Sequence, residues 1–284
     1  MNFYIVIPAH NEEAYIAQTL QSLIEQTFPP KKIVVVNDNS TDGTQTIIDN
    51  FSEKYPSISS IKTNSKDEHI PGSKVINAFN KGFETLDEHY EVICKFDADI
   101  IFPSNYIETI ETIFRKNKEC GMAGGFCYIN KNSTWILETL TNKDHIRGAL
   151  KAYRKECFSE IGGLKSTMGW DTVDELIAQY HGWQVCLDET LKVKHLKPTG
   201  KYYSKASKHK QGEAFYKIRY NYILCLIASL KLAVKKKSVL YFINCMKGYH
   251  KSKRNNLPFI VSEKEGVFIR KLRWKNIKKK FLLF

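Results

Sequence analysis

Residues 92–99 read Val92-Ile93-Cys94-Lys95-Phe96-Asp97-Ala98-Asp99, a short, mainly apolar run that ends in two aspartates. Such a run predicts a buried β-strand. The two carboxylates then stand one residue apart where the strand leaves its sheet, and they repel each other unless a cation lies beside them. Mg²⁺ and Mn²⁺ take oxygen ligands and bridge protein carboxylates to the phosphates of a substrate. Alone, Asp-x-Asp is a weak signal, because short acidic pairs are common on loops.

The residues that precede this stretch alternate between strand and helix patterns. Apolar runs predict strands at 3–7, 33–36, 57–62 and 90–96, and apolar residues at helical spacing predict helices at 16–24, 44–51 and 75–86. Asn11 is expected to cap the first helix, with Glu12 and Glu13 in its first turn. All-apolar strands alternating with helices predict an α/β fold whose mostly parallel central sheet is covered on both faces.

Polar segments follow three of the predicted strands. They are Pro8–Asn11, Asn37–Gly43 and Asp97–Asp99. Ligands of parallel α/β sheets bind beyond the carboxyl ends of the strands, so we expect these segments to share one crevice. Asp38 is placed to accept hydrogen bonds from a nucleobase. An ordinary strand–turn–helix connection, with Asn or Asp side chains capping the helix, also explains residues 37–44.

The pattern from residue 120 to residue 200 is mixed. It predicts strands at 121–128, 148–153, 183–187 and 191–195, and helices at 156–161 and 172–180. The length of 284 residues suits one large domain, or one domain with an appendage. We expect a catalytic domain over residues 1–200 and a basic, helical C-terminal region over residues 201–284.

Positive charge is concentrated in that C-terminal region. Residues 1–200 carry 21 lysines and arginines against 27 acidic residues, whereas residues 201–284 carry 22 against 3. This asymmetry favours a polyanionic partner. The apolar segments 220–234 and 238–246 are shorter than the roughly 20 residues that span a bilayer. Apolar residues beside lysines suit contact with an anionic membrane surface, and a helical subdomain packed on the core explains them equally well.

The seven cysteines are dispersed and form no CxxC pair. This favours a reducing compartment over a disulfide framework or a zinc site. Residues 1–8 do not match a secretory signal peptide, since no basic residue precedes the short apolar run. We therefore expect a cytoplasmic protein, peripheral at the inner face of the membrane if the C-terminal region binds lipid.

Three motifs together resemble the family 2 glycosyltransferases. They are Ile7-Pro8-Ala9-His10-Asn11-Glu12-Glu13, Val36-Asn37-Asp38-Asn39-Ser40-Thr41-Asp42-Gly43-Thr44 and Phe96-Asp97-Ala98-Asp99. Order and spacing match as well as residue type, over residues 3 to about 200, and only loosely beyond. The resemblance implies the Rossmann-like GT-A fold and inverting transfer of a sugar from a nucleotide-sugar donor. It also implies a divalent Mg²⁺ or Mn²⁺ cofactor and a saccharide or lipid-linked acceptor, in cell-surface polysaccharide or glycolipid synthesis.

The same resemblance implies roles on the donor side. The matched positions are Pro8, Ala9, Asn11 and Glu12 beside the nucleoside, Asp38 at the base, Asp97 at the sugar or ribose, and Asp99 at the metal. Asn37 departs from the aspartate that is commoner there, which leaves the identity of the base open. Lys74 matches a basic residue near the donor, where it meets a phosphate or the base, or is simply a solvated helix lysine.

His195 lies where some GT-A enzymes place a further metal ligand. Its position before a basic Pro-Gly turn favours ligation about as strongly as a structural role. Inverting transfer also needs a general base for the acceptor hydroxyl, away from the metal. The segment 169–175, followed by Gly182-Trp183, resembles the family's acidic segment and puts Asp171 at the base position, with Asp174 as the second choice. Asp171 also suits the N-cap of the helix predicted at 172–180.

Two other functions remain open on the residues alone. A nucleotidyltransferase that makes nucleotide sugars would use a related sheet, but segment 8–13 lacks the glycines of its phosphate-gripping loop. A non-catalytic basic binding module would need no acidic crevice. A Rossmann dehydrogenase is excluded, because no GxGxxG follows a strand. No nucleic-acid partner is expected.

Overall fold

The computed structural model describes residues 1–64, 72–138, 144–197 and 208–281. The chain divides into two compact units. The first unit comprises Met1–Glu68, Lys74–Leu164 and His181–Lys201, and the second comprises His69–Ser73, Lys165–Tyr180 and Tyr202–Phe284. The second unit therefore contains, besides the C-terminal region, two segments that lie before residue 200.

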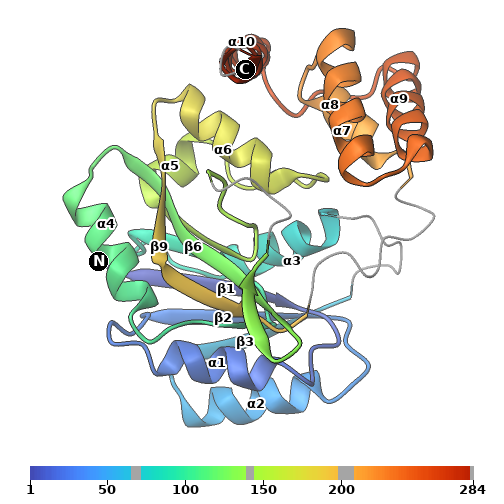
Figure 1. Ribbon diagram of the computed structural model, residues 1–284. Helices are drawn as coiled ribbons and strands as arrows, with labels where there is room; N and C mark the ends of the chain where they lie inside the picture. The colour runs from blue at the N-terminus through green and yellow to red at the C-terminus, as the bar shows by residue number, and fades with distance from the viewer. Residues whose placement is uncertain (65–71, 139–143, 198–207, 282–284) are drawn as a thin grey trace. The chain divides into compact units, whose positions relative to one another are not determined.

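The first half of the sheet in the first unit is parallel. Its strands are β1 (Phe3–Ala9), β2 (Lys32–Asp38), β3 (Ile58–Thr63) and β4 (Val92–Phe96), in the order β3-β2-β1-β4. Three helices connect these strands, namely α1 (Ile16–Ile24), α2 (Thr44–Lys54) and α3 (Ser73–Phe83). Helices α1 and α2 lie on one face and α3 on the other (Figure 1). The predicted strand–helix alternation is confirmed, and the carboxyl ends of β1, β2 and β4 meet at one edge.

The second half of the sheet is mixed. Strand β8 (Leu150–Arg154) runs antiparallel between β4 and β6 (Cys120–Lys131), and β9 (Gln184–His195) runs parallel to β6. Two short strands complete it, with β5 (Ile100–Ile101) antiparallel to β9 and β7 (Thr134–Leu137) antiparallel to β6. Helices α4 (Tyr106–Lys116) and α5 (Lys155–Glu160) belong to the same unit.

Strand β9 corrects one prediction. The sequence predicted two short strands, at 183–187 and 191–195, with the polar residues Asp188–Thr190 between them. In the structure β9 is continuous, because pairing with β6 resumes after an irregularity. Gly124 pairs with Leu187 and Phe126 pairs with Lys192, so the polar residues leave the register without ending the strand.

The N-terminal cap of α1 was also predicted wrongly. The helix begins at Ile16 after Tyr15, and no acidic residue lies in its first turn. Asn11 instead takes a left-handed conformation with φ of 52°, which asparagine tolerates better than most residues. Its side chain accepts a hydrogen bond from the backbone of Thr41 rather than from the helix. The Asn11 side chain is therefore bonded to the loop after β2 and does not cap α1.

The second unit is helical throughout its regular elements in the described residues. Its helices are α6 (Trp170–Tyr180), α7 (Lys210–Lys217), α8 (Tyr222–Lys235), α9 (Val239–Arg254) and α10 (Glu263–Phe281). Asp171 lies inside the first turn of α6, so its predicted N-cap role is wrong, although an acid there still favours the helix dipole. In the described ranges no helix is both long enough and apolar enough to cross a bilayer.

Gly82 permits the close packing of α3 against β1 and β2. A Cβ atom there would lie 2.5 Å from Val6 Cγ1 and 2.6 Å from Val36 Cγ2. Both valines are fully buried, so neither methyl group can move away freely.

We expect Gly82→Ala to lower the free energy of unfolding by about 1–3 kcal/mol in a urea titration, despite the better helix propensity of alanine. The exposed neighbour Lys81 provides the control, and Lys81→Ala should stay within about 0.5 kcal/mol of wild type. A Gly82→Ala protein more stable than wild type would contradict this account of the packing.

Candidate active site

The loops that follow β1 and β2 are joined by hydrogen bonds. Residues 11–13 and 40–44 exchange four bonds of 2.8–2.9 Å: Asn11 N to Ser40 Oγ, Thr41 N to Asn11 Oδ1, Glu12 N to Thr44 Oγ1 and Gly43 N to Glu13 Oε2. Although burial opposes it, hydrogen bonds from Thr44 hold the pKa of Asp42 below its usual value. Hydrogen bonds therefore hold the two polar segments together at the edge of the sheet, where the sequence predicted that they would meet.

Asp38 ends β2 inside this structure. It is buried, and its Oδ1 accepts a 3.1 Å hydrogen bond from Thr63 Oγ1. Its backbone carbonyl lies 2.6 Å from His10 Nδ1. Pro8 and Ala9 pair with Val36 and Asn37 in the adjacent strand. The predicted nucleoside-side residues thus come together at neighbouring strand ends.

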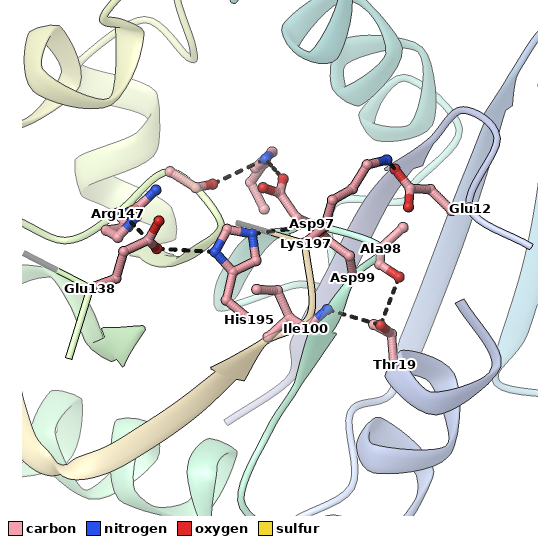
Figure 2. Close-up of polar contacts among 12 residues, drawn as sticks. Glu12, Thr19, Asp97, Ala98, Asp99, Ile100, Glu138, Arg147, His195 and Lys197 are labelled. Atoms are coloured by element: carbon pink, nitrogen blue, oxygen red, sulfur yellow. Dashed lines mark hydrogen bonds and ion pairs between the residues drawn. The ribbon is translucent and has the colours of Figure 1, made fainter. Parts of the chain in front are cut away.

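The two aspartates after β4 are held separately. The Asp97 carboxylate pairs with the buried ammonium of Lys95, which also donates to Gly148 O at 3.0 Å. Thr19 Oγ1 donates to Ala98 O at 2.7 Å and accepts from Ile100 N at 3.1 Å (Figure 2). Helix α1 therefore holds the turn between Asp97 and Asp99 in place.

Asp99 faces His195, the last residue of β9. Asp99 Oδ2 lies 3.4 Å from His195 Nε2, while His195 Nδ1 lies 3.1 Å from Glu138 Oε2. Arg147 Nη1 reaches the same Glu138 oxygen at 2.7 Å. Figure 2 shows these four side chains in a line, with the imidazole between the two carboxylates. Burial alone would lower the pKa of His195, but Asp99 and Glu138 raise it to about 9.

Glu12 completes the acidic cluster. Its Oε1 accepts a 2.9 Å hydrogen bond from Lys197 Nζ, and its Oε2 is buried with no hydrogen-bond partner among the described residues. Burial raises the pKa of Glu12 and Lys197 opposes the shift, while the nearby charges of Asp99 and Asp97 raise it further. The charges of Asp97 and Asp99 therefore act on the Glu12 carboxylate across the strand ends.

The cluster suits a divalent cation on the Asp99 side of His195. A carboxylate oxygen and an imidazole nitrogen 3.4 Å apart can ligate one ion once that ion displaces the imidazole proton, and Mn²⁺ accepts both donor types. A second group, Cys127, Glu138 and His195, has ligand atoms within 4.8 Å of one another. Arg147 already neutralises Glu138 there, and burial raises the pKa of the Cys127 thiol, so this group is the poorer cation site.

Four residues of this cluster were not predicted: Lys95, Glu138, Arg147 and Lys197. Lys95 left a signal, since a charged residue two positions before Asp97 in an apolar strand shares its face. No sequence pattern indicates Glu138, because it lies 57 residues before His195 and reaches it only through the β6–β7 hairpin.

The other three predicted residues lie on helices. Lys74 is half-buried in the first turn of α3. Asp171 and Asp174 lie on α6, which belongs to the second unit. Asp174 is 2% exposed whereas Asp171 is half-buried, so Asp171 is the more accessible carboxylate of the two.

A parallel sheet with an acidic, polar carboxyl edge is the architecture of nucleotide-binding α/β enzymes. Residues 4–160 match the family described as Glycosyl transferase family 2. The chain therefore belongs to this family.

Known proteins agree with this assignment. The chain is 41% identical over 97 residues, 34% of its length, to the probable glycosyltransferase YdaM of Bacillus subtilis. It spans 22–57% of the lengths of the first five curated relatives.

Two solved structures share the fold. S. aureus TarS 1-349 in complex with UDP-GlcNAc superposes with a TM-score of 0.59 at 17% identity, over 78% of this chain and 68% of that one. The mannosyltransferase PcManGT of Pyrobaculum calidifontis, with GDP-Man and Mn²⁺, gives 0.57 at 14% identity, over 97% and 80%. The fold is accordingly GT-A, with a C-terminal helical extension, as predicted.

We expect the charge of His195 to make stability depend on pH. Because the folded-state pKa is raised from 6.5 to about 9, the protonated imidazole stabilises the fold fully below pH 6.5 and the effect is lost as pH rises to about 9. The loss should reach about 3 kcal/mol in the free energy of unfolding. Urea titrations in EDTA across this range test it. His195→Gln is the control and should flatten the profile, and parallel profiles for both proteins would contradict the ion pairs.

Proposed function

We propose that the protein is a divalent-metal-dependent, inverting glycosyltransferase that uses a nucleotide-sugar donor. The observation that carries the proposal is the convergence of Glu12, Asp97, Asp99 and His195 at the carboxyl edge of the sheet. TarS and PcManGT, which share the fold, are described with nucleotide sugars, and PcManGT with Mn²⁺.

Asp99 and His195 are the proposed cation ligands, with Mg²⁺ or Mn²⁺ neutralising the charge of a nucleoside diphosphate when it is bound. The ion pair with Lys95 holds the Asp97 carboxylate in place for the donor's sugar or ribose. The cross-linked loops support Pro8, Ala9, Asn11 and Asp38 around the nucleoside. Lys74 contributes a positive charge for the diphosphate. Orientation by these groups lowers the entropic cost of in-line attack.

Asp171 is the proposed general base. A carboxylate that takes the proton from an acceptor hydroxyl must be reached by that hydroxyl. Asp171 is half-buried at the start of α6, whereas Asp174 is almost fully buried, so accessibility favours Asp171. The proton moves from the acceptor oxygen to Asp171 as that oxygen displaces the nucleoside diphosphate.

The proposed acceptor is a saccharide or a lipid-linked saccharide of a cell-surface polymer or glycolipid. The name of TarS, a poly(ribitol-phosphate) β-N-acetylglucosaminyltransferase of S. aureus, supports a surface-polymer role. Residues 1–200 form the catalytic domain in this proposal. The basic region 201–284 holds the enzyme at the inner, cytoplasmic face of the membrane.

Removing the cation or its ligands should abolish turnover. We expect EDTA to stop donor hydrolysis and transfer, and Mn²⁺ to restore both. Asp99→Asn and His195→Gln should each weaken Mn²⁺ binding, measured by electron paramagnetic resonance, at least about 100-fold, because even outer groups around a metal cost 10–100-fold. Asp49→Asn, on the exposed face of α2, is the control. Unchanged turnover in EDTA would contradict the metal's role.

Removing the base should leave the donor site intact. We expect Asp171→Asn to lower kcat for transfer about 10²–10⁴-fold, since that is the range for a general base. The donor Kd, from thermal shift across a nucleotide-sugar panel, should stay within about twofold. If Asp174→Asn alone produced the loss, the base would be Asp174. A product that retained the donor's anomeric configuration by NMR would refute inversion.

A further inference from the structure

Large apolar side chains gather on the surface of the α8–α9 hairpin. Ten such side chains are exposed in the described part of the chain, and seven lie between residues 222 and 243: Tyr222, Ile223, Leu230, Val234, Val239, Leu240 and Ile243. The two most exposed are Val239 at 76% and Val234 at 71%, and they flank the turn that joins the helices. The apolar surface is therefore concentrated at one place.

These exposed side chains are not the residues through which α8 and α9 pack against each other. Helices α8 and α9 already pack against each other in an antiparallel pair, with Cys225 Sγ 3.9 Å from Met246 Sδ. Figure 1 shows the two helices side by side. The buried residues of the two helices are different ones from the exposed apolar residues. They include Cys225, Ser229, Cys245 and Gly248.

The exposed residues of α8 form a regular stripe. Ile223, Leu230 and Val234 are spaced seven and four residues apart, which puts them on one side of a helix. The stripe reaches the end of α8 at Val234. The exposed residues Val239 and Leu240 follow directly after the turn, at the start of α9. A solvent-facing apolar stripe of this kind is typical of a helix that lies at a membrane interface.

The charge of the hairpin is entirely positive. Residues 222–254 contain eight lysines and arginines and no acidic residue. Lys235, Lys236 and Lys237 stand between the two most exposed valines. Lys247, Lys251 and Arg254 line an open groove beside His209 and His250. Cations that border an exposed apolar patch complement the headgroups of anionic lipids.

Other occupants fit this surface less well. A second copy docked on the same face would bring two sets of eight positive charges together with no acidic residue to balance them. A nucleic acid would match the charge, but its phosphates would leave the apolar stripe without a partner. The described helices do not span a bilayer, which leaves interfacial contact.

We propose that the α8–α9 hairpin inserts its turn into the interfacial region of an anionic bilayer. Val234, Val239 and Leu240 enter the boundary of the acyl chains, and Lys235, Lys236 and Lys237 lie at the level of the lipid phosphates. The inference specifies the membrane contact named in the proposed function. It rests on that proposal only for placing the acceptor at the membrane.

The test is co-sedimentation of the full chain with vesicles of phosphatidylcholine, with and without 30% phosphatidylglycerol. Donor and divalent cation are omitted, so a failed transferase proposal does not affect the readout. We expect Val239→Ser/Leu240→Ser to weaken binding to the anionic vesicles at least tenfold. Val239→Trp should tighten it severalfold, because indole rings favour the interface. Lys235→Gln/Lys236→Gln/Lys237→Gln should weaken binding about fivefold per lysine at low salt.

Matched variants lie in the first unit. Ile136→Ser removes an exposed apolar side chain, and Lys116→Gln/Lys118→Gln/Lys131→Gln removes three exposed lysines. Both should bind vesicles as wild type does, and circular dichroism should be unchanged in all variants. Wild-type binding by Val239→Ser/Leu240→Ser, or equal binding to pure phosphatidylcholine, would overturn the proposal. So would a concentration-dependent dimer in sedimentation velocity that the serine variant abolishes, which would assign the surface to self-association.

Discussion

Carboxylates that would repel one another stand together at one edge of the sheet, and each is paired with a cationic side chain. Lys95 pairs with Asp97, Lys197 with Glu12, and His195 with Asp99 and Glu138. Partly buried charges of one sign are tolerated only with such partners. The order of the strands β1, β4 and β9 is what brings these partners within reach, so the candidate site depends on this compensation.

The compensation divides the acidic residues by role. Asp97 is occupied by a lysine of its own strand, whereas Asp99 shares a histidine whose other nitrogen faces Glu138 and Arg147. An imidazole held in this way presents a fixed nitrogen toward Asp99. Glu12 keeps one buried oxygen without a hydrogen-bond partner in the described residues. The edge thus offers a cation the Glu12 oxygen that accepts no hydrogen bond, together with the Asp99 carboxylate and, once its proton is displaced, the His195 nitrogen.

The two units contribute different physical properties. The first carries the buried strands and the acidic edge. The second carries the excess positive charge and the exposed apolar hairpin, together with α6 and its carboxylates. The proposed transfer from a water-soluble donor to a membrane-bound acceptor would need both a polar, charged site and a surface that tolerates lipid. Separate units let each be built from residues that would destabilise the other.

The sequence by itself determined the parallel half of the sheet, because all-apolar strands alternating with helices have few other solutions. It also placed Asp38, Asp97 and Asp99 at strand ends, and the three motifs identified the family. Only the tertiary structure decided the partners of those acids. Glu138 reaches His195 through a hairpin, and Arg147 reaches Glu138, with no local sequence pattern to indicate either contact. The Asn11 side chain bonds to the backbone of Thr41 and does not cap α1. Periodicity reports which face of an element is buried, whereas charge pairing depends on which distant elements meet there.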